Sequence, residues 1–285
     1  MKLSGYLIEK YNNMGNAYSC RRLMEEAQKQ SIDLRMIGAG DTNIKGGDCY
    51  NQGQILSKRD FIINRYKYGK IKDYLNGLCR KNYNNLQALN IYINKSEQLK
   101  NINSDYFMKP KYIVGFCSLS FQMLADELKL PFIAKGLESS MGREIFLIKN
   151  KDEYEHLAHL YSEAKEWLFE EFIAESCGRD MRIYCVRGEA IAAMERRAES
   201  DFRANVALGA NVKKITIEPY FQNIAQDIYQ QTGLDFVGLD LLYGKELPYF
   251  CEINVTAGLE GIEKATGVNV AGTIIQTIKD DFHAE

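Results

Sequence analysis

The segment YFCEINV, residues 249–255, carries an acid and an amide two positions apart, Glu252 and Asn254. Side chains of a β-strand alternate between its two faces, so Phe250, Glu252 and Asn254 are expected to share one face. Cys251 and Ile253 are then expected on the opposite, buried face. Carboxylate and amide oxygens grouped in this way suit a hard divalent cation such as Mg²⁺ or Mn²⁺.

A second apolar segment, FVGLDLL, residues 236–242, adds Asp240 to this pair. If the residues YGKELP close a symmetric turn between the two strands, Asp240 lies directly opposite Glu252. Two carboxylates about 5 Å apart repel by roughly 3 kcal/mol at an effective dielectric near 20, so a cation or a shared proton must offset the repulsion. Metal binding by Asp240, Glu252 and Asn254 is one interpretation, and an ion pair to a nearby Lys or Arg is the other.

Lys135 ends an apolar strand immediately before the loop GLESSMGRE, residues 136–144. The small residues Ser139, Ser140 and Gly142 let backbone N–H groups approach anionic oxygens, and the lysine supplies a positive charge. The loop therefore suits phosphate binding, although an ordinary hairpin with a Ser/Gly turn has the same composition. It is not a P-loop, because no G-x-x-x-x-G-K-[ST] motif occurs in the chain.

Acidic residues recur along the segment WLFEEFIAESCGRDMR, residues 167–182. Glu170 and Glu171 lie in its apolar part, and Glu175 and Asp180 follow. An extended linker of this kind can bind adenine through its backbone, and a nearby acid can accept hydrogen bonds from ribose hydroxyls. Solvated charges at the rim of a fold are the alternative.

The segment MERRAESDFRANV, residues 194–206, contributes Arg196, Arg197, Arg203 and Asn205. The planar donors of an arginine match two oxygens of a phosphate or carboxylate at once. Surface ion pairs would use the same residues.

The hydrophobic patterns indicate the elements that must position these side chains. The first 38 residues alternate strand, helix and strand, which is typical of an open α/β sheet. The further expected elements are loops with one short strand at 41–60, strands at 59–66 and 89–94, a helix at 69–82, a helix at 120–129, strands at 130–137 and 143–148, a helix at 151–166, a strand at 167–174, a hairpin at 180–198 turning at Arg187-Gly188, a helix at 220–233, a hairpin at 236–255 and a helix at 269–282. A domain boundary is expected near residue 94, with an α+β ligand-binding body after it.

Composition excludes several classes of protein. The formal net charge of −2 gives no overall basic field for nucleic acid or an anionic membrane. No apolar run approaches the roughly 18 to 20 residues that cross a bilayer, and the N-terminal segment turns polar too early for a signal peptide. Seven cysteines without a C-x-x-C pair favour a reduced, cytoplasmic protein over a disulfide framework or a zinc site.

Several motifs, in this order, resemble the RimK-type branch of the ATP-grasp ligases. The matching segments are AYSCRRLMEEA, EEFIAESCGRDMRIYCV, AAMERRAESDFRAN, GLDLL and CEINVTAGLEGIEKATGVNVAG. The resemblance covers residues 1–280 and is weakest over 38–94, and its last motif is the most specific.

The resemblance implies an N-terminal α/β domain, residues 1–94, followed by an ATP-grasp fold of two α+β subdomains. Residues 95–166 would form the small subdomain with the phosphate loop, and residues 167–285 the subdomain with the metal site. The implied activity is an ATP- and Mg²⁺-dependent (or Mn²⁺-dependent) carboxylate–amine ligase that works through an acyl phosphate. Its substrates would be a carboxylate on a protein, peptide or metabolite and an amino acid as amine donor, with glutamate as the leading candidate.

The resemblance also implies roles for individual residues. Asp240, Glu252 and Asn254 would hold the metal, and Arg203 and Asn205 would contact the transferring phosphoryl group. The residues implied to bind the nucleotide are Lys95, Lys135, Ser139, Ser140, Gly142, Glu170, Glu171, Phe172, Asp180, Arg203 and Asn205. Closure of residues 137–144 over the nucleotide would shield the acyl phosphate from water.

The chain departs from the family pattern at several positions. The family usually has glycine where Ser139 and Glu144 stand, and aspartate where Asn94 stands. Leu208-Gly209-Ala210 replaces the frequent Arg-Gly-Gly, which removes a plausible anchor for a substrate carboxylate. Two other functions therefore stay open: a non-catalytic ATP-binding module acting through a partner, and a dipeptide or cell-wall precursor ligase on the same fold. A homo-oligomer is also left open.

Overall fold

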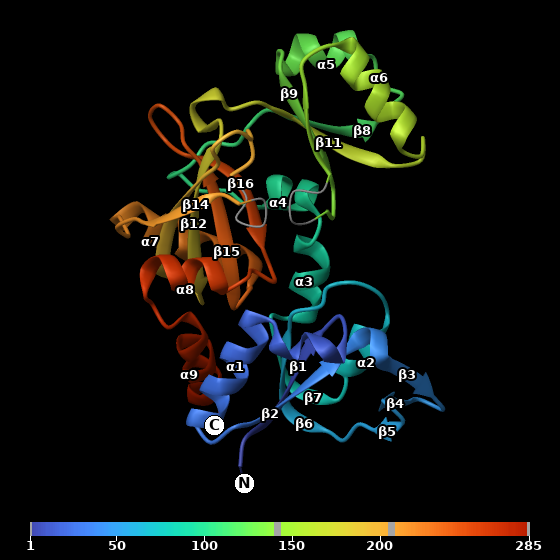
Figure 1. The fold of residues 1–285 in the computed structure, drawn as a ribbon, viewed down its shortest axis with the longest axis vertical. Coiled ribbons are helices and arrows are strands. Elements are labelled where there is room, and N and C mark those ends of the chain that lie inside the picture. The colour runs from blue at the N-terminus through green and yellow to red at the C-terminus, as the bar shows by residue number, and fades with distance from the viewer. Residues whose placement is uncertain (1, 140–143, 205–208, 284–285) are drawn as a thin grey trace.

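The computed structural model describes residues 2–139, 144–204 and 209–283. The expectations for Ser140, Gly142, Asn205 and Leu208 lie outside these residues. Figure 1 shows the N-terminal part in blue at one end of the molecule and a green part at the other end. The yellow-to-red C-terminal part lies between them along one side.

The N-terminal part is built on a parallel sheet in the order β2-β1-β6-β7. Its strands are β1 (Ser4–Glu9), β2 (Asp33–Gly38), β6 (Arg59–Asn64) and β7 (Cys79–Tyr83), and its helices are α1 (Tyr18–Lys29), α2 (Ile71–Asn76) and α3 (Leu86–Tyr92), with short 3₁₀ turns at Asn12–Asn16 and Ala39–Asp41. A small antiparallel sheet, β3 (Thr42–Lys45), β4 (Asp48–Asn51) and β5 (Gln54–Ile55), is inserted between β2 and β6. This is the α/β arrangement expected for the start of the chain.

Helix α4 (Lys95–Asn101) leads into an antiparallel sheet in the order β10-β9-β11-β8. The strands are β8 (Tyr112–Phe116), β9 (Phe132–Gly136), β10 (Ile145–Ile148) and β11 (Glu166–Glu171), and the helices α5 (Phe121–Leu128) and α6 (Lys151–Leu160) cover one face. Aromatic side chains fill the space between helices and sheet, and Trp167 lies against Phe146 and Tyr161.

The C-terminal part carries an antiparallel sheet in the order β14-β13-β12-β15-β16. Its elements are a 3₁₀ turn (Ala174–Ser176), β12 (Arg179–Val186), β13 (Glu189–Arg197), β14 (Asn211–Lys214), α7 (Pro219–Thr232), β15 (Phe236–Leu242), β16 (Tyr249–Asn254), α8 (Glu260–Thr266) and α9 (Val270–His283). Helix α7 begins at a proline and ends at Gly233, whose φ of +64° is a left-handed conformation that favours glycine.

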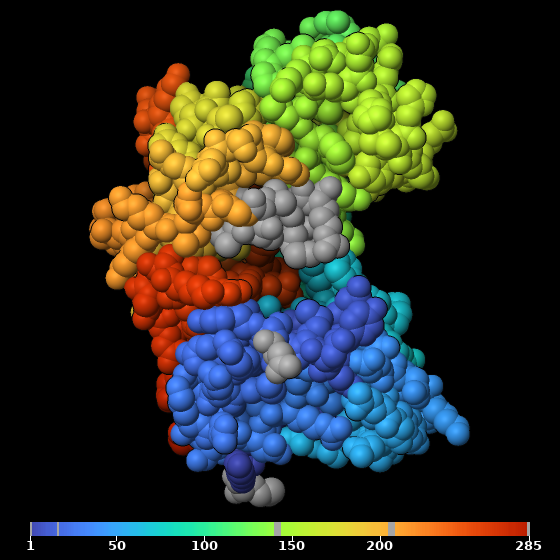
Figure 2. Space-filling view, in the orientation of Figure 1, coloured from blue at the N-terminus to red at the C-terminus, as the bar shows by residue number. Residues whose placement is uncertain are grey.

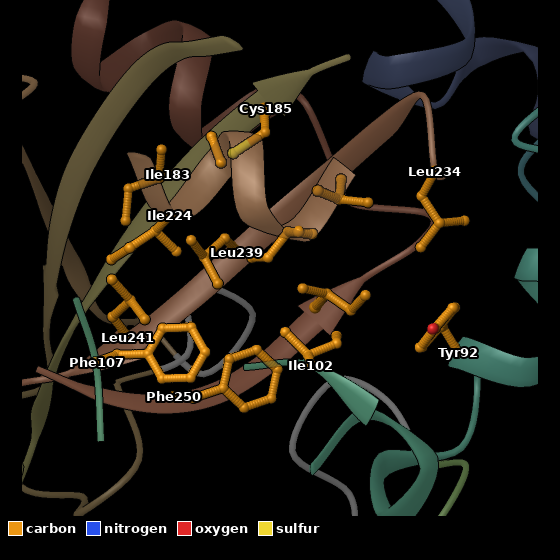
Figure 3. Packing of buried hydrophobic residues seen from close by; sticks show 14 of the residues in the cluster. Tyr92, Ile102, Phe107, Ile183, Cys185, Ile224, Leu234, Leu239, Leu241 and Phe250 are labelled. Atoms are coloured by element: carbon orange, nitrogen blue, oxygen red, sulfur yellow. The ribbon is translucent and has the colours of Figure 1, made fainter. Parts of the chain in front are cut away.

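Each face of this sheet packs against a different hydrophobic cluster. One face contributes Ile183, Leu239 and Phe250 to a core shared with α3, α4 and α7 (Figure 3). The other face contributes Tyr184 and Met194 to a second core, which also contains residues of α1, α8, α9 and the N-terminal sheet. Helix α9 lies beside α1 in Figure 1, so the last helix covers part of the first domain.

Most expected elements after residue 119 are confirmed, including the turn at Arg187-Gly188, where both residues have positive φ. Two assignments between 69 and 94 are wrong. The expected helix 69–82 stops at Asn76, and Cys79–Tyr83 forms strand β7. The expected strand 89–94 is mostly helix α3, whose first N–H groups are capped by the side chain of Asn85.

Two further expectations need correction. Residues 41–60, expected as loops with one short strand, hold the inserted sheet β3-β4-β5. Strand β11 pairs with β8 and β9, so a subdomain boundary at 166/167 would cut it from its sheet, and residue 171 divides the sheets more naturally. No helix in the described parts of the chain combines the length and apolar character needed to cross a bilayer.

Candidate functional site

All three parts of the chain line one cleft with a volume of about 1220 Å³. This exceeds the roughly 300–1,000 Å³ of an ordinary small-molecule pocket, so the cleft has room for more than one ligand. In the space-filling view the green and blue parts are separated by an indentation on one side (Figure 2). Within the described residues, the cleft collects most of the side chains that the sequence singled out.

Strands β15 and β16 place two acids face to face. Asp240 and Glu252 are directly paired across the strands, as the symmetric turn predicted. The pairing then shifts by one residue, because Leu241 pairs with Phe250 and Cys251 is the extra residue of a β-bulge. The expected side for two residues is therefore wrong: Phe250 points into the hydrophobic core (Figure 3), and Cys251 lines the cleft with Glu252 and Asn254.

Asp240 is held by two arginines. Arg182 donates to both of its oxygens, at 2.6 and 2.5 Å, and Arg196 donates to Oδ2 at 2.9 Å. Arg196 also donates to both oxygens of Asp180, at 2.6 Å each. Burial would raise the pKa of Asp240, but Arg182 and Arg196 outweigh it and hold that pKa below its usual range. The ion pair to arginine, which the sequence offered as the alternative to metal binding, is thus present at Asp240.

The amide of Asn254 lies between the two carboxylates. Its Nδ2 donates to Asp240 Oδ2 at 3.2 Å and to Glu252 Oε1 at 3.0 Å. Burial would raise the pKa of Glu252, but Lys95, Lys135 and the Asn254 hydrogen bond lower it overall, so both acids are ionised near neutral pH.

These donors fit a hard cation. Turning the amide of Asn254 by 180° would place its oxygen between two carboxylates, an arrangement that only a cation stabilises. No cluster of three or more His, Cys, Asp or Glu side chains suited to a metal occurs in the described residues, so a third ligand from a side chain here would be the amide of Asn254.

Two buried lysines approach the same acids. Lys95, at the start of α4, lies with its Nζ 3.6 Å from Glu252 Oε2 and donates to the carbonyl oxygen of Ser139 at 2.6 Å. Lys135 on β9 pairs with Glu170 of β11, and its Nζ is 4.0 Å from Cys251 Sγ. Burial would lower the pKa of Lys135, but Cys251 and Glu170 raise it, so the lysine stays charged.

Glu170 has one oxygen in use and one without a partner. It is 2% exposed, its Oε2 pairs with Lys135, and its buried Oε1 has no hydrogen-bond donor within the described residues. A buried acceptor of this kind is costly unless a ligand supplies the donor. The side chain lines the cleft, so a ligand with an N–H group would satisfy it.

The other predicted residues lie around the same cleft. Ser139, Glu171, Phe172, Asp180 and Arg203 all line it. Both oxygens of Asp180 accept hydrogen bonds from Arg196, and Arg203 donates to Asp201. Glu171 Oε2 accepts from the backbone N–H of Lys111. The structure therefore brings the described members of the predicted set together.

Sequence reasoning missed several residues of the cleft. Arg182 was not singled out, although it lies two positions after Asp180 on one strand and pairs directly with Asp240 on the next. Strand alternation could have placed it on the same face. The N-terminal part adds Lys10, Arg65 and Lys67 to the cleft, and their position after parallel strands was the available signal.

Comparison with known proteins gives consistent matches. Residues 117–278 match the model of the RimK-like ATP-grasp domain. The chain is 28% identical over 282 residues to a probable alpha-L-glutamate ligase of Parasynechococcus marenigrum (strain WH8102), which covers 92% of this chain and 59% of that protein. It is 29% identical over 281 residues to a probable alpha-L-glutamate ligase of Aliivibrio salmonicida (strain LFI1238), covering 92% and 91%. The chain thus spans about three fifths of the first relative and most of the second.

Among solved structures, the ATP-grasp ligase PsnB complexed with a minimal precursor has a TM-score of 0.74 at 16% identity, covering 98% of this chain and 99% of that one. The same ligase complexed with minimal precursor, Mg and ADP has a TM-score of 0.69 at 15% identity, covering 98% of each chain. These likenesses confirm the expected ATP-grasp fold.

Proposed function

The chain belongs to the RimK-like ATP-grasp family, and from this premise we propose that it is an ATP- and Mg²⁺-dependent ligase that joins a carboxylate to an amine. One observation carries the proposal: Lys95 and Lys135 flank the opposed acids Asp240 and Glu252 in a cleft with room for two ligands. Phosphoryl transfer requires cationic side chains that bind phosphate oxygens and anionic side chains that hold a metal, close together in a buried place.

The proposed reaction has two steps. An oxygen of the substrate carboxylate attacks the terminal phosphorus of ATP, the bond from that phosphorus to ADP breaks, and an acyl phosphate forms. The amine nitrogen then attacks the acyl carbon, the carbon–oxygen bond to phosphate breaks, and the nitrogen loses its proton. One ATP is consumed for each amide bond, and ADP and phosphate are released.

The residues of the cleft divide this work. Lys95 and Lys135 bind phosphate oxygens, and Arg203 contacts the group in transfer. Glu170, with its unused Oε1, accepts from the adenine amino group, and the backbone of Glu171 and Phe172 completes the base site. The other residues proposed to contact the nucleotide are Ser139 and Asp180, together with Ser140, Gly142 and Asn205 outside the described residues.

Asp240, Glu252 and Asn254 would hold Mg²⁺, with Mn²⁺ as a substitute of the same ligand preference. The ion, when bound, offsets the negative charge of the phosphates. Arg182 and Arg196 keep Asp240 ionised and fix its orientation toward Asn254. A solved structure of the same fold is complexed with Mg and ADP, which supports Mg²⁺ as the ion.

The names of the relatives guide the substrate proposal. Two are named probable alpha-L-glutamate ligases, and PsnB is complexed with a precursor. We therefore propose an amino acid, glutamate first, as amine donor and a carboxylate on a protein, peptide or small metabolite as acceptor. We propose that the chain divides into residues 1–94, 95–171 and 172–285. We further propose that the protein acts in the cytoplasm without a nucleic-acid or membrane partner, and a homo-oligomer is an option.

The experiment is to measure phosphate release with Mg-ATP across single amino acids, with and without a peptide extract, while product masses are recorded. We expect a mass gain of one amino-acid residue with one ADP per product, and loss of both in Asp240→Ala. Tight Mg-nucleotide binding without any turnover would instead favour a non-catalytic module. A product of two free amino acids would favour a dipeptide ligase.

A further inference from the structure

The N-terminal sheet meets the cleft at the place where its strand order reverses. From β1 the chain passes to β2 on one side, and it later returns to β6 on the other side of β1. In parallel α/β sheets the carboxyl ends of the strands on either side of such a reversal form a ligand-binding crevice. Here those ends carry Glu9, the last residue of β1, and Arg65 and Lys67 after β6, and all three line the cleft.

The acid at this point is already neutralised. Glu9 Oε1 accepts from Arg65 Nε at 2.9 Å, and Glu9 Oε2 accepts from the backbone N–H of Lys10 at 3.3 Å. Arg65 also donates from Nη1 to the carbonyl oxygen of Ala257 at 3.0 Å, just beyond the strand that carries Asn254. The Glu9–Arg65 pair therefore fixes this wall beside the proposed metal site, and the charge left over on the wall is positive.

Lys67 supplies that charge. It is half-buried, and within the described residues no carboxylate lies within 4 Å of its ammonium group. Burial lowers the pKa of Lys67, and the more distant Glu252 and Glu138 only partly oppose the shift. A cation that has lost water without gaining a paired anion is stabilised by a ligand carrying a negative charge.

We propose that Lys67, with Arg65 beside it, holds the free carboxylate of the amino acid that donates the amine. This inference rests on the ligase function proposed above and deepens it. In the function proposed above, adenine lies at Glu170 and the phosphates lie at Glu252, whose charge acts on Lys67. The amine must reach the acyl phosphate at that end, and an amino acid keeps its carboxylate one carbon away from its amine. Lys67 is thus a cation on the wall where that carboxylate arrives, and within the described residues it has no ion pair.

The test is steady-state kinetics of Lys67→Gln with three Michaelis constants measured separately, for amine donor, acceptor and ATP. A charged hydrogen bond of this kind corresponds to roughly a 10- to 100-fold change. We expect the KM of the amino-acid donor to rise by about that factor and the other two constants to stay within about twofold. The wild type should prefer the amino acid over its carboxamide, because the carboxamide has no charge for Lys67 to bind. In Lys67→Gln this preference should be smaller by the same factor.

Two variants control for a structural effect. Lys67→Arg should restore most of the donor KM, since it keeps the charge. Lys70→Gln, three positions further along and almost fully exposed, should behave as wild type. An unchanged donor KM and carboxamide preference in Lys67→Gln, or a rise in the KM of ATP or acceptor instead, would overturn the inference.

Failure of the inference can be told from failure of the ligase proposal. If the wild type turns over no donor at all, the ligase proposal fails. Calorimetry of amino-acid binding to the Mg-nucleotide-loaded protein, wild type against Lys67→Gln, then still tests the carboxylate site: equal affinities, or no binding by either, would rule it out.

Discussion

Arg196 joins Asp180 to Asp240 through a single buried guanidinium group. The three residues lie on β12, β13 and β15, so this contact links three neighbouring strands along the wall of the cleft. Arg182 adds a second, bidentate contact to Asp240. The acid that the sequence singled out as a metal ligand is therefore also the centre of an ion-pair network.

Asp240→Ala is expected to lower stability as well as activity. The change leaves the half-buried Arg182 and the buried Arg196 without this anion, and breaking a buried pair costs about 3–5 kcal/mol. Asp240→Asn keeps the shape and one acceptor oxygen, so its loss of stability should be smaller. Urea unfolding of both variants and the wild type measures the difference, and equal midpoints for Ala and wild type would contradict the network.

The two acids should also make the protein sensitive to acid. The pKa values of Asp240 and Glu252 are lowered in the folded chain, so the unfolded chain binds protons first as pH falls. Their contribution to stability is present above about pH 4 and is lost as pH falls through the folded pKa values. Unfolding free energies measured from pH 6 to pH 3 should fall, and less steeply in Glu252→Gln.

Cys251 should report occupancy of the cleft. Burial raises the pKa of its thiol to about 12, so at pH 8 very little of the thiol is ionised. Alkylation should be slow, rise about tenfold per pH unit, and slow further with Mg-ADP. Peptide mapping by mass spectrometry gives the rates, and the exposed Cys177 is the internal control, since its rate should not respond to nucleotide.

Glu170→Gln should weaken nucleotide binding. The amide keeps the size of the side chain but loses the charge that pairs with Lys135, and its NH₂ group competes with any donor on the ligand. We expect the Kd of ATP to rise by roughly 10- to 100-fold. Calorimetry checks this, with Glu153→Gln on helix α6, outside the cleft, as a control that should bind ATP normally.

The residues of the site were predictable from sequence where strand alternation and the resemblance agreed. The pairing of Asp240 with Glu252 was predictable, because a symmetric hairpin is the simplest interpretation of the segment that contains them. The sides of Phe250 and Cys251 were not predictable, because a β-bulge shifts the alternation by one residue and leaves no mark in local composition.

Long-range pairing explains the remaining errors. Cys79–Tyr83 lacks the alternation of a strand and becomes one through parallel pairing with β6. The Ile and Tyr residues of 89–94 suggest a strand, but the cap at Asn85 and the buried spacing of Leu89 and Tyr92 make a helix. Lys67 became a candidate only when the order of the N-terminal sheet was known.

The packing of α9 on α1 bears on how the chain folds during synthesis. Leu7, Leu23 and Phe61 share a core with Ile274 and Ile278 of α9. Domains at the start of a chain usually fold while the ribosome is still translating. Here one side of the first domain remains uncovered until α9 leaves the exit tunnel, so the nascent chain presents an apolar surface to chaperones until that point.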